Sequence, residues 1–183
     1  MTGTRDVTPD GSAAIAVGIG RAIAGELRAA VSEALRWLVA LPEDESQRRP
    51  RPGGWSPREI IGHLIDSASN NHGRFVRGAL DASLVFATYD QEAWVELQRY
   101  HDQDWTALLE RWAALNEQVA VAIERIPDTT LQRMRREHNF DRIAWKTVAA
   151  SEPVTLEYFI RDYIGHLRHH LDQIAAIVAP RPR

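Results

Sequence analysis

Apolar side chains recur at intervals of three and four residues in four long segments of the chain. These segments span residues 12–41, 57–80, 104–126 and 156–178, and a shorter one spans residues 90–99. Such spacing places the apolar side chains on one face of an α-helix, where they can pack against neighbouring helices. No segment alternates apolar and polar residues as a half-buried strand would. The pattern predicts an all-α fold built as a four-helix bundle.

Residues that cap helices mark the starts of two of these predicted helices. Ser56 can cap the second helix with Glu59 as its capping-box partner, and Pro57 suits the first helical position. Thr155 can cap the last helix in a similar way. Trp55 directly precedes the cap at Ser56, and we expect it to pack on the end of the bundle.

The chain is expected to form one domain over residues 1–183, with a loose N-terminus at residues 1–11. A chain of 183 residues can bury a full hydrophobic core, and its composition shows no break that would indicate a second domain. Residues 127–153 are polar and irregular in pattern, which predicts a long connection between the last two helices.

The composition argues against several classes of partner. A formal net charge of −3 gives no broad basic surface, so no nucleic-acid partner is expected. No apolar run approaches the roughly 20 residues needed to span a membrane. The apolar residues 13–20 follow acidic rather than basic residues, unlike a signal peptide, so a cytoplasmic location is expected. The absence of cysteine excludes disulfides, thiolate metal ligands and a cysteine nucleophile.

Three of the seven histidines, His166, His169 and His170, lie within five positions of the last predicted helix. His166 and His170 are four residues apart, a spacing by which two imidazoles on one helix face can share a metal ion. His169 lies to the side of that face, as a third ligand or as an exposed neighbour. One helix cannot readily complete a coordination shell, so a further ligand should come from another helix, and His63 is the candidate.

The helix face that carries His63 is polar, whereas the opposite side of this helix is apolar. The polar residues on or beside this face are Glu59, Asp66, Ser67, Asn70 and Arg74. A regular polar stripe of this kind is expected either at the solvent or around a buried polar site. On spacing alone, a solvated cluster is the more common explanation for a pair of histidines on an amphipathic helix.

Two sequence stretches, taken together, favour a site over a solvated cluster. "WSPREIIGHLIDSASNNHGRF" at residues 55–75 and "YIGHLRHHLDQI" at residues 163–174 resemble the DinB-like superfamily, which includes the YfiT-type proteins. The resemblance extends from about residue 20 to residue 178. It implies an up-down-down-up four-helix bundle that is often a homodimer. It also implies an enzyme, because members of this superfamily include proteins described as hydrolases, and transferases that depend on small-molecule thiols.

The resemblance also implies a metal site. His63, His166 and His170 match the positions that hold a divalent ion, zinc or nickel, and His169 matches a position that is not a ligand. Carboxylates close to these histidines on the helical wheel could orient the imidazole rings, and they are Glu59, Asp66 and Asp162. Side chains that could bind a polar or anionic group of a small-molecule substrate are Asn70, Asn71 and Arg74.

The sequence therefore predicts a metal-binding bundle that acts as a hydrolase or as a thiol-dependent transferase. Three neutral imidazoles would leave a coordination position open, as in catalytic zinc sites. One alternative is a non-catalytic dimeric bundle, a stress-related or ligand-binding module, in which a fourth protein ligand closes the site. Another is that no metal binds and the histidines form a surface feature.

Overall fold

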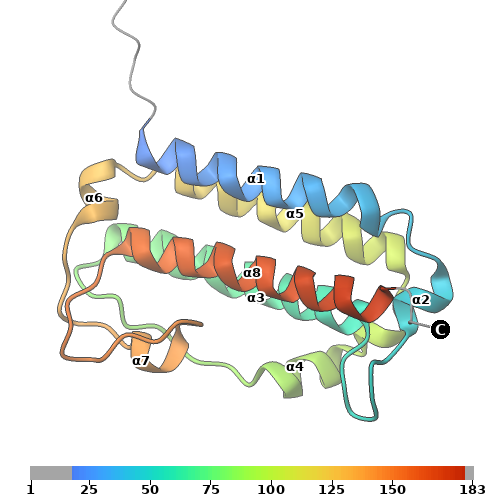
Figure 1. The fold of residues 1–183 in the computed structure, drawn as a ribbon. Coiled ribbons are helices and arrows are strands. Elements are labelled where there is room, and N and C mark those ends of the chain that lie inside the picture. Colours follow the sequence, from blue (N-terminus) through green and yellow to red (C-terminus); the bar gives the residue numbers. More distant parts are fainter. Residues whose placement is uncertain (1–17, 180–183) are drawn as a thin grey trace, which may run out of the picture.

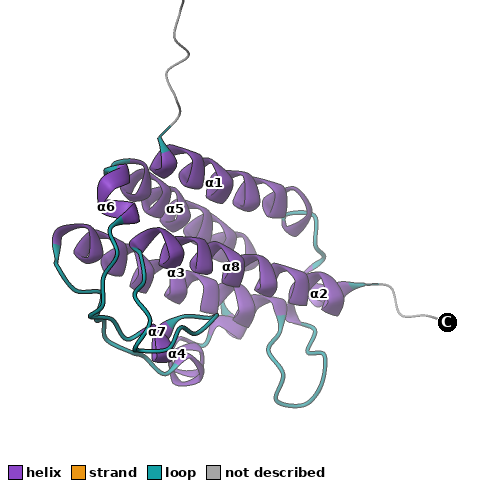
Figure 2. Cartoon of the chain, turned by 60° about the vertical axis from the view of Figure 1, so that its left-hand side comes forward, coloured by secondary structure: helices purple, strands orange, loops and turns teal. Residues whose placement is uncertain are grey.

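Four long helices form the body of the structure, a computed structural model that describes residues 18–179 (Figure 1). They are α1 (Ile19–Leu38), α3 (Pro57–Leu80), α5 (Trp105–Glu124) and α8 (Leu156–Val178). Shorter helices lie in the connections between them. These are α2 (Glu43–Gln47), α4 (Gln91–Gln98), the 3-10 helix η1 (Tyr100–Asp102), α6 (Asp128–Gln132) and α7 (Phe140–Ile143). Two isolated β-bridges are the only β-type pairings that the described part of the chain contains (Figure 2).

The helix directions confirm the predicted up-down-down-up bundle. In Figure 1, α1 and α8 run in one direction, and α3 and α5 run in the other. The connection at residues 81–104, which includes α4, returns the chain along the outside so that α5 can start at the same end as α3. Helix α5 packs against α1 and α3, and α8 packs against α3 and α1. The predicted all-α architecture is therefore confirmed.

Local capping explains where α3 begins. The Ser56 hydroxyl accepts a hydrogen bond from the Glu59 backbone N–H, while the Glu59 carboxylate accepts one from the Ser56 N–H at 2.8 Å. Thr155 caps α8 as expected. The helix predicted at residues 12–41 is described from Ile19 and ends earlier, at Leu38, because the chain turns there towards α2. Residues 12–17 and the predicted loose N-terminus at residues 1–11 lie outside the described residues.

The core lies between the four long helices. Its largest fully buried side chains include Phe75, Tyr100 and Trp112. Two hydrogen bonds join polar side chains within the core: the Tyr163 hydroxyl donates to Asn116 Oδ1 at 2.6 Å, and Trp105 Nε1 donates to the Leu38 carbonyl at 3.0 Å. The hydrogen bond from Trp105 joins the end of α1 to the start of α5.

Gly62 marks the closest approach of another segment to α3. A Cβ atom placed on Gly62 would lie 2.1 Å from Cγ of Tyr100, far inside van der Waals contact. The Tyr100 ring is fully buried, and its hydroxyl donates to Asp66 Oδ1 at 2.7 Å. Gly62 therefore leaves room for the ring beside the helix turn that carries His63.

Residues 127–153 form the predicted long connection, and the structure gives it more order than its irregular pattern indicated. It contains α6 and α7, and Arg135 within it is buried and donates from Nη1 to the Gly78 carbonyl at 2.6 Å. In Figures 1 and 2, α4 and α7 lie on the side of α3 and α8 that faces away from α1.

The helices of the described residues do not meet the requirements of a membrane span. None of those within residues 18–179 is both long enough and apolar enough to cross a bilayer.

Candidate metal centre

Three imidazoles from two antiparallel helices meet in the structure. His63 comes from the first half of α3, and His166 and His170 come from the middle of α8. The Nε2 atom of His166 lies 3.3 Å from Nε2 of His63 and 3.0 Å from Nε2 of His170. No other histidine, aspartate or glutamate within residues 18–179 belongs to this cluster. The residues that the sequence singled out as candidate ligands are therefore brought together.

The spacing of these nitrogens matches the requirements of a small divalent cation. Zinc binds imidazole nitrogens at about 2.0–2.1 Å, so two ligand nitrogens at a tetrahedral angle lie about 3.3 Å apart. The observed separations of 3.0 and 3.3 Å are close to that value. The donor set and its geometry thus fit a divalent ion.

Hydrogen bonds alone do not provide partners for the Nε2 atoms of His63, His166 and His170. Nδ1 of His170 lies 2.8 Å from Oε1 of Gln173, an acceptor, so the proton of a neutral His170 is on Nδ1 and its Nε2 carries a lone pair. The three Nε2 atoms face one another. They can share at most one proton, carried by Nε2 of either His166 or His63. A cation would satisfy all three lone pairs at once.

Burial keeps the three imidazoles neutral, which is the form that binds metal. Desolvation is the largest cause in each case, and the neighbouring histidines add to it. It lowers the pKa of His63 to about 3 and the pKa of His166 to about 3. The pKa of His170 is lowered to about 4, because the contact with Gln173 partly opposes the effect of burial.

Two tryptophans flank the histidine cluster. The Trp55 ring centroid lies 5.1 Å from that of His63 and 6.5 Å from that of His170. Trp145, from the connection at residues 127–153, lies 6.4 Å from His166. Trp55 was expected to pack on the bundle end, and its contacts show that this end of the bundle includes the histidine cluster.

The three clustered histidines line two cavities. The larger cavity, of about 440 Å³, is lined by His170, Trp55 and Gln173, together with Pro50, Arg51, Gly53 and Gly54. The smaller, of about 200 Å³, is lined by His63 and His166. Gln91, at the start of α4, lines both. The three imidazoles can therefore be approached from two directions.

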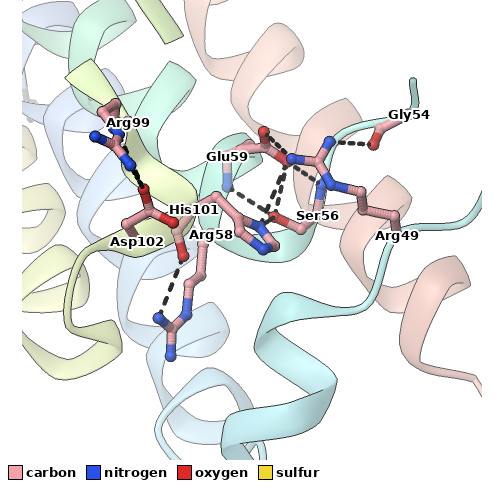
Figure 3. A network of polar contacts seen from close by, with 8 residues as sticks. All are labelled: Arg49, Gly54, Ser56, Arg58, Glu59, Arg99, His101 and Asp102. Carbon is pink, nitrogen blue, oxygen red and sulfur yellow. Dashed lines mark hydrogen bonds and ion pairs between the residues drawn. The ribbon is translucent and has the colours of Figure 1, made fainter. Parts of the chain in front are cut away.

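Glu59, a predicted neighbour of the site, takes part in a different network (Figure 3). Its carboxylate accepts hydrogen bonds from the Ser56 N–H at the helix cap and from Arg49 Nη2 at 2.6 Å. Nδ1 of His101 lies 3.1 Å from the Ser56 hydroxyl in the same network. None of these contacts reaches the three histidines, so Glu59 stabilises the start of α3.

Asp66 and Asn70 also point to partners outside the cluster. Oδ1 of Asp66 accepts from the Tyr100 hydroxyl and from Gln98 Nε2 at 2.6 Å. Its Oδ2 is buried and has no hydrogen-bond partner among the described residues, and burial raises its pKa. Asn70 donates to the Asp66 carbonyl. Nδ1 of His63 is likewise buried without a partner in the described part of the chain.

Asp162, Asn71 and Arg74 do lie beside the cluster, because all three line the smaller cavity. The two oxygens of Asp162 accept the backbone N–H groups of Trp145 and Lys146, each at 2.8 Å. Asp162 thereby holds the connection at residues 127–153 against α8, next to His166.

Several residues at the site were not found from the sequence. Trp145 and Tyr89 line the smaller cavity from irregular segments whose pattern carries no signal for such a position. His169, by contrast, is exposed and lies outside the cluster, with its Nε2 3.0 Å from Gln173 Nε2.

Sequence comparison relates the chain to a family. Residues 26–174, which include all three clustered histidines, match the DinB superfamily. The chain belongs to the DinB superfamily. Bacillus subtilis (strain 168) has a relative named "Putative metal-dependent hydrolase YfiT", which is 25% identical over 144 residues, or 78% of this chain and 75% of the relative. A Bacillus licheniformis relative with the same functional name is 28% identical over 159 residues, which cover 83% and 81% of the two chains.

Structural comparison supports the fold of this DinB superfamily member. The solved structure of YfiT from Bacillus subtilis superposes with a TM-score of 0.66 at 21% sequence identity, over 96% of this chain and 92% of YfiT. That protein is described as having "an unusual four-helix bundle topology". The same arrangement of helices is present in both structures.

Proposed function

We propose that this chain is a metal-dependent hydrolase in which His63, His166 and His170 hold a zinc or nickel ion. The observation that carries the proposal is a cluster of three neutral imidazoles that line two cavities, with Nε2 of His166 3.0 Å from that of His170 and 3.3 Å from that of His63. The names of the relatives from two Bacillus species support the same activity. Imidazole ligands suit zinc and nickel alike, so the donor set does not select between them.

Such an ion, held by three neutral protein ligands, retains its charge and an open coordination position, and it supplies activated water and polarisation of a substrate oxygen. The protein's own groups prepare the site for this chemistry. Gln173 fixes the tautomer of His170 so that Nε2 faces the cluster. Trp55 and Trp145 place aromatic rings beside the imidazoles of His63 and His166.

The cluster of three protein ligands, to which residues 18–179 add no fourth histidine or carboxylate, favours an enzyme over a metal-stabilised structural bundle. Structural zinc sites are normally closed by four protein ligands. Within residues 18–179, no additional histidine or carboxylate joins the three imidazoles, and the exposed His169 lies outside the cluster. Both cavities instead leave room for a ligand beside the histidines.

The presence of two cavities favours a second candidate function, the transfer of a small-molecule thiol. Hydrolysis requires one organic substrate, whereas transfer requires two to reach the metal together. A cavity of about 440 Å³ on the His170 side could admit the thiol, while the smaller cavity admits the acceptor. For either function, we predict that the protein forms a homodimer and is located in the cytoplasm.

An activity assay with controlled metal content tests the proposal and separates the two candidates. Protein loaded with zinc or nickel is assayed against a panel of esters and amides, with and without a low-molecular-weight thiol, and products are identified by mass spectrometry. We expect hydrolysis without thiol, reduced at least about 100-fold in His166→Ala, since metal catalysis supplies several kcal/mol. Thioester products that form only with thiol, with release of the alcohol or amine, would favour transfer.

The control for this assay is His72→Ala, which removes a histidine of α3 that lies outside the cluster. This variant should keep the wild-type rate. If metal-loaded protein converts no substrate, with or without thiol, that result would contradict both candidate functions and support a structural metal site.

A further inference from the structure

Arg74 is a buried cation to which the structure gives no acidic partner. Its residue surface is 5% exposed, and it forms no ion pair within residues 18–179. Its Nη2 donates to the Ala87 carbonyl at 2.7 Å, and its Nη1 lies 3.4 Å from Oδ1 of Asn71. Burial lowers its pKa, because desolvation disfavours the charged form. A buried charge without a counterion is costly, and such groups commonly bind a ligand of opposite charge.

The guanidinium shares a cavity with the histidine cluster. His63, Ser67, Asn71 and Arg74 follow one another at intervals of four, four and three residues, so they form one stripe along α3. All four line the smaller cavity. Helical side chains lean towards the N-terminus of their helix, which directs Arg74 back towards Asn71 and the histidines.

The rest of the cavity lining favours a small and partly aromatic or apolar ligand. Tyr89, Trp145, Phe159 and Tyr163 contribute rings to a space of about 200 Å³. The Arg74 guanidinium lies over the Tyr89 ring, 5.8 Å from its centroid. This contact holds the guanidinium in place without neutralising it.

Asp162 is the carboxylate that also lines this cavity, but it does not serve as the counterion of Arg74. Each of its oxygens accepts a backbone N–H from Trp145 or Lys146. One positive group and one already bonded carboxylate favour a ligand with a single negative charge. A phosphate dianion would meet additional repulsion from Asp162.

We propose that the smaller cavity binds the carboxylate of a small monoanionic substrate through Arg74, which directs the rest of the substrate towards the three histidines. This inference rests on the proposed function and specifies its substrate class. A guanidinium binds a carboxylate through two parallel N–H groups, so Arg74 fixes the orientation of the substrate as well as its charge.

Binding of benzoate and benzamide tests the inference. The two probes have nearly the same shape, but only benzoate carries a carboxylate. Titration calorimetry on the protein as purified, and again after treatment with a chelator, gives the ratio of their affinities in each state. The wild type should bind benzoate at least about 10-fold more tightly than benzamide in both states, because a charge-assisted pair is lost with the amide.

Variants assign the preference to Arg74. Arg74→Gln should remove the preference for benzoate. Arg77→Gln is the matched control, because it removes an exposed arginine one turn further along the same helix, and it should keep the wild-type ratio. If Arg74→Gln does not fold, the side-chain Nε–H signal of Arg74 in wild-type protein is followed by NMR, and it should shift on addition of benzoate but not of benzamide.

The outcomes separate this inference from the proposed function. A preference for benzoate that survives in Arg74→Gln, or an Arg74 signal that does not move at saturating benzoate, would overturn the inference. A preference present only before chelation and independent of Arg74 would place the carboxylate on the metal, which overturns the inference and leaves the metal site intact. A preference that depends on Arg74 after chelation supports the inference even if no hydrolysis is found.

Discussion

Metal-free protein should lose stability as the pH falls below about 6.5, the ordinary pKa of histidine. In the unfolded chain the three clustered histidines take up protons near that pH. In the folded protein, burial lowers the pKa of His63 and His166 to about 3 and that of His170 to about 4. The unfolded state therefore binds more protons between these limits, and the free energy of unfolding decreases as the pH falls.

The expected loss is large. One pKa unit corresponds to about 1.4 kcal/mol at full slope, and the unfolded-state imidazole is half protonated at its ordinary pKa, so His63 alone should contribute a loss of about 2 kcal/mol over the two pH units below that pKa. Asp66 and Asp162 act in the opposite direction, because burial raises the pKa of each carboxyl and the folded state binds the proton more readily. They offset part of the loss without changing its cause.

Urea unfolding of metal-free protein between pH 7 and pH 4.5 measures this effect. His63→Gln removes one titrating imidazole, so its stability should depend less steeply on pH, by about 1.4 kcal/mol per pH unit. His72→Gln, a substitution of the same kind on the same helix but outside the cluster, is the matched control. Equal pH dependence in wild type and His63→Gln would mean that His63 is solvated in the folded protein.

Gly62→Ala should destabilise the protein by about 3 kcal/mol, at the upper end of the cost of overpacking a core. The added methyl group would lie 2.1 Å from the buried ring of Tyr100, which is also held by its hydrogen bond to Asp66. Either the ring or the helix must move. The effect runs against helix propensity, which alone favours alanine over glycine by about 1 kcal/mol.

Thermal unfolding of Gly62→Ala measures this prediction, and the midpoint should fall by about 6–12 °C for a chain of this size. Gly25→Ala is the control, because a Cβ atom at that position of α1 meets no atom within 4 Å. That variant should be unchanged or slightly more stable. A stabilised Gly62→Ala protein would show that the segment at η1 does not pack against α3 as described.

Local and periodic features could be predicted from the sequence. The capping box at Ser56 and Glu59 depends on residues three positions apart, and apolar spacing alone predicts the long helices. His63, His166 and His170 were singled out by their spacing together with the resemblance of two stretches, and the structure brings them together. The role of Glu59 could have been settled from the sequence as well, because a carboxylate used in a capping box is not free to orient an imidazole.

Features that depend on long-range contacts could not be predicted. Trp145 reaches His166 because Asp162 holds its backbone and Arg135 binds the end of α3, and neither contact has a sequence period. The polar stripe of α3 indicated a site or a solvated surface, but only the packing of residues 81–104 and 127–153 shows that part of it lines a cavity. Which part of the stripe lines a cavity depends on tertiary packing, and the pattern of the sequence does not contain it.

The central claim is that one divalent ion binds between α3 and α8, and metal content tests it most directly. Elemental mass spectrometry on untagged protein compares the wild type with His63→Ala, His166→Ala and His170→Ala, and with the controls His72→Ala and His169→Ala. We predict about one zinc or nickel ion per chain in the wild type and both controls, and less than about a tenth of that in the three cluster variants. Wild-type protein that holds neither metal, even after incubation with each ion, would contradict the claim.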